Sequence, residues 1–154
     1  MLSKEAQKEW NIRFWNGFKN EMKAFNSSNG RRINWLTYPT DIKHMYLRMV
    51  CEKDGVALHF DSQFSDQGIR DIVWEQLEEL KSLINVQMNY PSIWSRGFQT
   101  KEGLVIDRIS WKLNNVNYLK EEEWPIIYDF FKKRILEFDK FHQEFKDILI
   151  NLVD

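Results

Sequence analysis

The spacing of hydrophobic residues changes repeatedly along this chain, and these changes constrain its fold more than any other feature. Near the N-terminus, apolar residues recur at steps of three and four, which places them on one face of a helix. They are Leu2, Ala6, Trp10, Phe14, Trp15, Phe18, Met22 and Phe25. Residues 26–30, Asn-Ser-Ser-Asn-Gly, favour a turn and end this helix. Beyond them the apolar spacing falls to two, the period of a β-strand.

Alternation at this shorter period predicts strands at residues 31–38, 43–51, 56–61, 93–99 and 104–113. The helical period returns over residues 66–85 and again from about residue 122 to the end. The order of elements is then α-β-β-β-α-β-β-α, with hairpins and no βαβ crossover. It predicts an α+β fold in which helices pack on an antiparallel sheet of about five strands. The length of 154 residues suits one domain, so we expect residues 1–154 to form a single domain.

Two hairpins follow from turn signals between the alternating runs. Asp54-Gly55 favours a two-residue type I′ turn, whose backbone needs positive φ at both positions. With this loop, Cys51 lies opposite Leu58, Met49 opposite Phe60, and Arg48 opposite Asp61. In the second hairpin, a turn at residues 101–103 gathers Trp94, Phe98, Val105, Ile109 and Trp111 on one face and sets Arg96 opposite Asp107.

The last helix carries a second kind of repeat. Its apolar positions alternate steps of four and three, which is the heptad seam of a coiled coil with one charged member. The seam consists of Ile127, Phe131, Arg134, Phe138, Phe141, Phe145, Ile148 and Leu152. A helix of this length spans about 45 Å, more than a small domain easily covers. We therefore expect a homodimer through the C-terminal helix.

Composition excludes several function classes. A net charge of −1 provides no strongly basic footprint for nucleic acid or anionic lipid, although residues 1–60 carry +4 and the remainder −5. No apolar run reaches the length of a membrane span, and the charged N-terminus lacks the apolar core of a signal peptide. The single cysteine, Cys51, cannot form an intramolecular disulfide. These features predict a cytoplasmic protein with no membrane partner.

The polar face of the first hairpin holds the most suggestive set of side chains. His44, Arg48, His59 and Asp61 point away from its apolar face, and Asp41 and Lys43 lead into it. One interpretation is an anion or phosphodiester site with a histidine for proton transfer. The other is a solvated or helix-covered face with one cross-strand ion pair. The aromatic residues least explained by an apolar stripe, and so expected in an exposed patch, are Trp35, Tyr38, Trp74 and Tyr90.

Other catalytic chemistry has little support in the sequence. Asp41-Ile-Lys43 matches the short D/E-x-K fragment of Mg²⁺-dependent nucleases but lacks an upstream acidic partner. Cys51 lies on the apolar side of its strand, where a cysteine is a small core residue rather than a thiolate. The chain contains no glycine-rich phosphate loop and no nucleophile elbow. We therefore predict no catalytic residue, no metal and no cofactor.

Several stretches together resemble a bacterial family of unknown function, domain-of-unknown-function family 4268. They are Phe14-Trp15, Ile33-Asn34-Trp35 with Tyr38 and Thr40, Lys43-His44, Arg48-Met49, residues 75–81, Trp124-Pro125, Phe130-Phe131, Arg134-Ile135 and Asp139-Lys140-Phe141. Asp41 stands where the family pattern has a glycine. Longer members are similar to a PD-(D/E)XK nuclease-like domain followed by this domain. Residues 1–154 contain no counterpart of that domain, so the resemblance implies an accessory role in nucleic-acid processing or defence and transfers no catalytic residue.

The sequence thus favours a non-enzymatic binding or assembly domain, with a homodimer and a nuclease-like protein as expected partners. The predicted binding residues are Asn34, Trp35, Tyr38, Lys43, His44, Arg48, His59 and Asp61. Arg48 would anchor an anion and His44 would donate a hydrogen bond. The alternative is a nucleic-acid-binding or nuclease-associated module on the same surface, with Arg31, Arg32 and Lys43 on phosphates.

Overall fold

The computed structural model describes residues 2–154 and has the expected α+β architecture. Its elements are α1 (Lys4–Met22), a 3₁₀ turn η1 (Trp35–Thr37), β1 (Met45–Glu52), β2 (Gly55–Ser62), α2 (Gln67–Glu79), α3 (Lys81–Met88), β3 (Ile93–Gln99), β4 (Val105–Asn114), η2 (Glu121–Glu123) and α4 (Trp124–Val153). The strands form one antiparallel sheet in the order β1-β2-β4-β3. Within the described residues the sheet therefore has four strands, not five.

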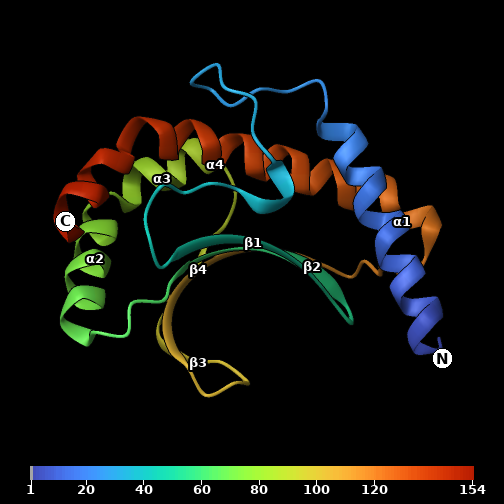
Figure 1. The fold of residues 1–154 in the computed structure, drawn as a ribbon, viewed down its shortest axis with the longest axis horizontal. Coiled ribbons are helices and arrows are strands. Elements are labelled where there is room, and N and C mark those ends of the chain that lie inside the picture. The colour runs from blue at the N-terminus through green and yellow to red at the C-terminus, as the bar shows by residue number, and fades with distance from the viewer. Residues whose placement is uncertain (1) are drawn as a thin grey trace.

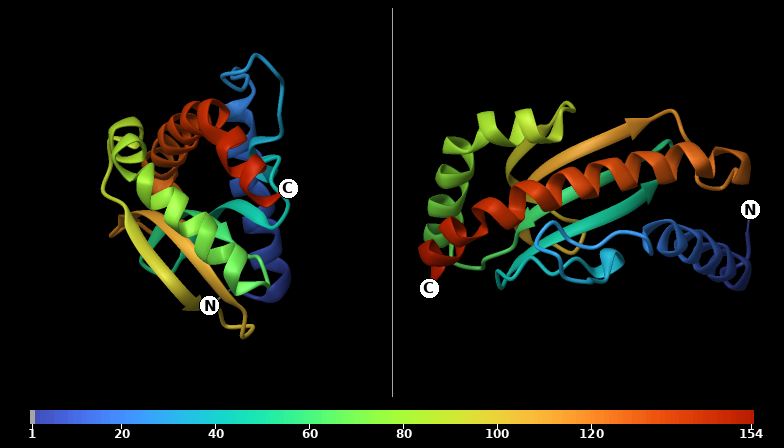
Figure 2. Two further views of the ribbon diagram at one scale, coloured as in Figure 1. Left: turned by 90° about the vertical axis from the view of Figure 1, so that its left-hand side faces the viewer. Right: turned by 90° about the horizontal axis from the view of Figure 1, so that it is seen from above.

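All the helices lie on the convex side of this curved sheet. α4 runs across the middle of that face, α1 covers one end, and α2 with α3 covers the other (Figure 1). Seen from above, the segment between α1 and β1 lies along one flank of α4, and α3 lies along the opposite flank (Figure 2). Within residues 2–154 no helix lies on the concave side, and the β3–β4 hairpin curls beneath it (Figure 1). The sheet thus has one covered face and one open face.

The prediction of a strand at residues 31–38 is wrong, and this explains why the sequence predicted five strands rather than four. The segment instead contains η1, capped by Asn34, whose side-chain oxygen accepts a hydrogen bond from the backbone N–H of Leu36 at 3.0 Å. Asparagine competes for backbone groups in this way and favours turns over strands. The indole N–H of Trp35 donates to the carbonyl of Phe25 at 3.0 Å, which folds the segment back toward α1.

The first hairpin forms, but its predicted register is off by two residues. Glu52 pairs with Gly55, so Lys53-Asp54 form the loop, and Arg48 lies opposite His59 rather than Asp61. Gly55 belongs to the strand and pairs with β4 as well as β1, and a Cβ at this position would lie 2.6 Å from the Leu113 carbonyl oxygen, so the close approach requires glycine. A shift of two leaves each side chain on its predicted face.

The second hairpin departs from prediction through an irregularity between Ser95 and Phe98. Gly97 adopts a φ of 66°, and its N–H donates to the Asp107 carboxylate at 2.8 Å. Arg96 consequently does not face Asp107 and instead donates to Asp71 on α2 at 3.0 Å. Phe98 emerges on the open face, not beside Trp94 and Ile109 as predicted, because the extra residue reverses the alternation.

The helices also differ in detail from their predicted bounds. The helix expected over residues 66–85 divides at Leu80 into α2 and α3 and extends to Met88. α4 has its predicted length, with 30 residues. Its seam packs inside the same chain: Phe138 contacts Phe60 and the seam is buried from Ile127 to Phe141. This packing removes most of the seam from any contact with a second copy.

Candidate functional site

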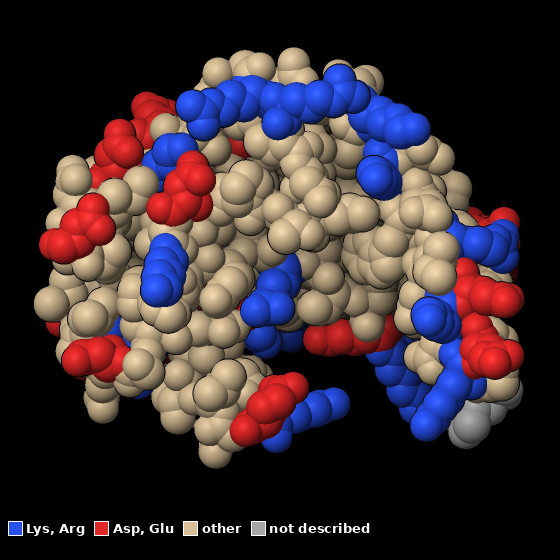
Figure 3. Space-filling view, in the orientation of Figure 1, with Lys and Arg blue, Asp and Glu red and all other residues tan. Residues whose placement is uncertain are grey.

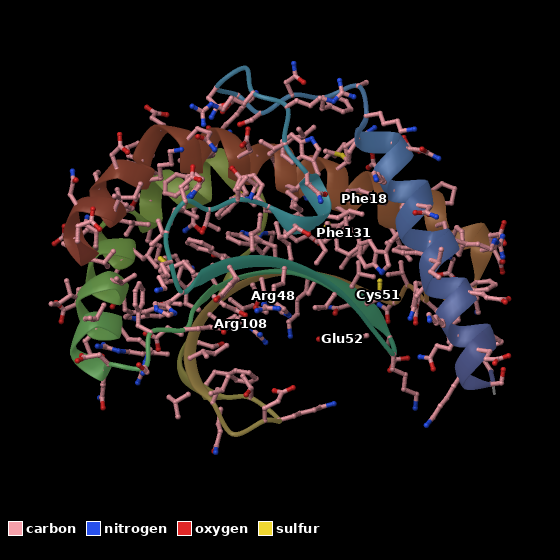
Figure 4. The ribbon with its side chains drawn as sticks, in the orientation of Figure 1. Phe18, Arg48, Cys51, Glu52, Arg108 and Phe131 are labelled. Atoms are coloured by element: carbon pink, nitrogen blue, oxygen red, sulfur yellow. The ribbon has the colours of Figure 1, made fainter. Side chains whose placement is uncertain are left out.

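The open face presents mainly polar and charged side chains. Strand alternation places Tyr46 and Arg48 of β1, His59 and Asp61 of β2, and Arg108, Ser110 and Lys112 of β4 on this side. Figure 4 shows Arg48, Arg108 and Glu52 beneath the sheet, whereas Cys51, Phe18 and Phe131 lie on the helix side. The space-filling view shows that the molecule is hollowed below the sheet (Figure 3).

The floor of this hollow contains a buried ion pair. Arg108 donates to both carboxylate oxygens of Asp61, at 2.7 and 2.9 Å, and Asp61 is completely buried. The guanidinium carbon of Arg108 also lies 4.9 Å from the centre of the Phe98 ring. Asp61 and Phe98 therefore hold Arg108 in one orientation, with part of its side chain in contact with solvent.

His59 lies beside this pair and is held by a second strand. Its Nδ1 is 2.8 Å from the hydroxyl oxygen of Ser110 on β4. Burial, reinforced by the positive charge of Arg108, lowers the pKa of His59 to about 4. The ring is consequently neutral at pH 7 and serves as a hydrogen-bonding group without charge.

Arg48 is the exposed cation of the open face. Its guanidinium carbon lies 4.8 Å from the centre of the Tyr46 ring, which is itself 40% exposed. In the part of the chain that the structure describes, Arg48 makes no salt bridge. Its charge is therefore available to a ligand, unlike that of Arg108, which Asp61 partly neutralises.

A second feature, here called the basic pocket, lies between the end of α1 and η1. It has a volume of about 310 Å³ and is lined by Lys19, Met22, Lys23, Phe25, Arg32, Ile33, Asn34, Trp35 and Leu36. Its cations are all exposed, and among the described residues no carboxylate lines it. Figure 3 shows a band of Lys and Arg along the upper edge of that view, where the segment after α1 lies. The pocket thus combines an apolar floor with a cationic rim.

The same segment is held in place by a buried carboxylate on α4. Asp139 accepts hydrogen bonds from the hydroxyls of Ser27 and Tyr38, at 2.8 and 2.6 Å, and from the backbone N–H of Ser28 at 2.6 Å. Burial and the nearby Asp139 raise the pKa of the Tyr38 hydroxyl, so it remains protonated as the donor. The Tyr38 hydroxyl therefore holds the segment on α4, and the side chain is buried.

Neighbouring contacts extend this attachment. His142 donates through Nε2 to the carbonyl of Thr40 at 2.7 Å, and Lys146 pairs with Asp41 at 2.7 Å. Asp41 adopts a φ of 63°, a left-handed conformation that aspartate tolerates better than most residues other than glycine. Because Asp41 pairs with α4, the Asp41-Ile-Lys43 fragment does not form an acid-lysine site.

The structure separates the predicted binding residues into different places. Arg48, His59 and Asp61 meet on the open face, and Asn34 and Trp35 line the basic pocket. His44 precedes β1 and packs against Phe64, while Lys43 is exposed beside it. The expected pairing of Arg48 with Asp61 is replaced by Arg108. His44 therefore packs on Phe64 just before the strand that carries Arg48.

The predicted aromatic patch is also wrong. Trp35, Tyr38 and Trp74 are buried, and Tyr90 is half-buried, with its hydroxyl donating to the Lys112 carbonyl at 2.6 Å. The exposed rings are instead Tyr46 and Phe98, at 40% each. Burial raises the pKa of the Cys51 thiol to about 12, which leaves it protonated and unreactive at neutral pH.

Sequence reasoning missed the contribution of β4 and α1. Arg108, Ser110 and Lys112 alternate with Ile109, Trp111 and Leu113, so the period-two pattern of β4 already separates a polar face from an apolar one. The pattern does not reveal the order of the strands in the sheet, and this order places β4 beside β2. Lys19 and Lys23 lie one helical turn apart, but the sequence does not show that Arg32 folds back toward them.

Two further properties of the described residues bear on function. Residues 2–154 contain no group of three or more His, Cys, Asp or Glu side chains arranged to hold a metal ion. None of the helices within that range is both long and apolar enough to cross a membrane.

Comparison with known proteins places the chain in a family. The model of a family described as "Domain of unknown function (DUF4268)" matches residues 11–146, nearly the whole chain. No curated protein matches the sequence. The match includes the segments that form the basic pocket, the open face and the Asp139 cluster.

Proposed function

This chain belongs to the DUF4268 family of domains of unknown function, and we propose that it is a non-catalytic domain that binds single-stranded nucleic acid on the open face of its sheet. One observation carries this proposal: two guanidinium groups lie over aromatic rings on a sheet face that none of the described helices covers. Cations beside exposed rings bind the phosphates and the bases of a single strand at the same time.

The chemistry of the face suits a single strand better than a duplex. In a duplex the bases are stacked and paired, so they cannot lie on Tyr46 or Phe98. An unpaired base can stack on either ring while Arg48 or Lys112 contacts the adjoining phosphate. The neutral ring of His59 and the hydroxyl of Ser110 are buried and hydrogen-bond each other, so they support this face from beneath and leave the strand to the exposed groups.

Fluorescence anisotropy with a labelled strand of about 6 nucleotides tests this proposal. We expect saturable binding at low salt that weakens as salt rises, because phosphate contacts release counterions. Arg48→Ala should weaken binding and reduce the slope of log K against log salt by about 0.7. Lys133→Ala is the matched control, since Lys133 is an exposed cation on α4 that pairs with Asp129.

Three outcomes would count against the proposal. They are the absence of saturable binding at low salt, equal binding of a duplex, and equal loss of affinity in the Arg48 and Lys133 variants. A melting temperature for each variant distinguishes lost contacts from lost structure. Arg48 is exposed, so its replacement should leave the fold intact.

Three expectations from the sequence remain predictions: assembly through α4, a nuclease-like partner and a cytoplasmic location. Of the seam residues, Ile148 and Leu152 are the exposed ones, so a dimer through α4 would form at its C-terminal end. Light scattering measures this directly, and a monomer at high protein concentration would contradict the dimer. A role beside a nuclease would require the partner to bring the catalytic residues.

A further inference from the structure

Three adjoining hollows connect the open face with the basic pocket. The first is the basic pocket, and the second, of about 240 Å³, is lined by Trp15, Leu36 and Met49. The third, of about 330 Å³, lies between residues 36–38 and residues 46–50 of β1. Leu36 lines all three, and Met49 lines the second and third. We call the second and third hollows the edge groove.

The edge groove follows the outer strand of the sheet. Among the described strands β1 pairs with β2 alone, so its other edge faces the groove. Arg48 and Tyr46 line the groove where it meets the open face. At the far end it adjoins the basic pocket with Lys19, Lys23 and Arg32. Cations thus lie at both ends, and half-buried Trp15, Leu36 and Met49 lie between them.

We propose that a single strand bound on the open face continues around the edge of β1, through the edge groove, and into the basic pocket. This inference rests on the proposed function and extends it to a longer binding path. The pocket's cationic rim would bind phosphates, and its floor of Phe25, Ile33 and Leu36 would contact a base or sugar. The absence of a lining carboxylate among the described residues makes the pocket complementary to an anion.

The length of the bound strand tests this path. A strand of about 6 nucleotides should occupy the open face alone, whereas one of about 14 should also reach the basic pocket. The K19Q/K23Q/R32Q variant should bind the short strand as the wild type does. It should lose the extra affinity for the long strand, and its salt slope with that strand should fall by about 2.

A control variant and a crosslink complete the experiment. K120Q/K133Q/K140Q removes the same number of exposed cations, none of which lines the three hollows. A photoreactive base at one end of the long strand should crosslink a peptide that contains residues 22–36. The pocket variant should lose this crosslink, and the control variant should keep it.

The outcomes separate this inference from the proposed function. If the short strand does not bind, the proposed function fails. The short strand could bind while a longer strand gains no affinity, or while crosslinks reach only β1 and β4. Either result would show that the path is wrong and would leave the proposed binding on the open face in place. If polyglutamate displaces the long strand from the pocket with equal affinity, the pocket binds acidic peptide, which also overturns the path.

Discussion

Asp139 and Asp61 are both buried carboxylates, yet their surroundings differ in a way that distinguishes a structural cluster from a binding surface. Asp139 lies under the segment after α1 and accepts hydrogen bonds from neutral donors on three residues of that segment. Asp61 lies under the open face and accepts both of its hydrogen bonds from the charged side chain of Arg108. The first carboxylate positions a length of backbone, and the second positions one cationic side chain.

The comparison also explains what each cluster can offer to a ligand. The donors around Asp139 are used internally, and Ser27 and Tyr38 are buried with it. Arg108 keeps one fifth of its side chain exposed. Mutation of Asp139 should therefore alter stability without a specific effect on the open face, whereas mutation of Asp61 should alter both stability and binding.

The largest expected effect is the loss of the Asp139 cluster. Asp139→Ala leaves two hydroxyls and one backbone N–H without their acceptor, so we expect the free energy of unfolding to fall by about 4 kcal/mol. Urea denaturation measures this loss. Asp139→Asn is the matched control, because it keeps one acceptor oxygen and should cost less. An unchanged urea midpoint in Asp139→Ala would show that the cluster does not hold the segment.

Asp61→Asn should lower stability less than Asp139→Ala does, and it should strengthen binding at the same time. Arg108 can reach water after the substitution, so we expect the free energy of unfolding to fall by about 2 kcal/mol. The charge of Arg108 is no longer neutralised, and affinity for a short single strand should rise about threefold, equivalent to roughly 0.6 kcal/mol. Urea denaturation and anisotropy measure the two effects. A fall in affinity would contradict this prediction. It would mean that binding depends more on the orientation that Asp61 gives Arg108 than on the removal of the Asp61 charge.

Acid should destabilise the floor of the open face through His59. Its pKa is about 6.5 in the unfolded chain and about 4 in the folded protein, so the unfolded state binds the proton more readily. The contribution of His59 is complete above pH 6.5 and is lost as pH falls toward 4, with about 2 kcal/mol lost at pH 5.

Urea denaturation at pH 7.5 and pH 5 checks this dependence. Buried His142 also has a lowered pKa and shifts stability in the same direction, so the wild type alone does not isolate His59. His59→Gln should show a smaller loss between the two pH values. Equal losses in the two proteins would assign the acid sensitivity to other groups.

The smallest effect on stability is expected for Arg48→Ala, the variant that defines the binding site. Arg48 is exposed, so we expect the free energy of unfolding to change by less than about 0.5 kcal/mol. Thermal denaturation measures this change. A loss comparable with that of Asp61→Asn would indicate that Arg48 packs on Tyr46 for stability and would weaken its assignment to a ligand.

The sequence predicts much of the fold because faces depend on local periodicity. Ile109 and Trp111 alternate with Arg108 and Ser110, and that spacing separates the two sides of β4 wherever the strand lies. The same reasoning located the helical stripe of α4, although it assigned the stripe to a dimer. Whether such a stripe meets a sheet or a second copy depends on distant residues such as Phe60, which the local pattern does not contain.

The candidate site was less predictable because its contacts join distant segments. Arg48 and Asp61 carry opposite charges and lie on adjoining strands, so the sequence favoured an ion pair between them. The observed register differs from the predicted one by two residues, Gly55 lies against β4, and Asp61 pairs with Arg108. Likewise, η1 replaced a predicted strand because the side chain of Asn34 binds the backbone locally.

Periodicity in the sequence alone thus decides which side chains share a helix stripe or a sheet face, since the backbone repeats of 3.6 and 2 residues act within each segment. Only the tertiary structure decides which of those faces is covered and which side chains become partners. A register shift of two residues preserves every face and changes every cross-strand neighbour. For this protein, that distinction separates an expected Arg48–Asp61 pair from an Arg48 that remains available to a ligand.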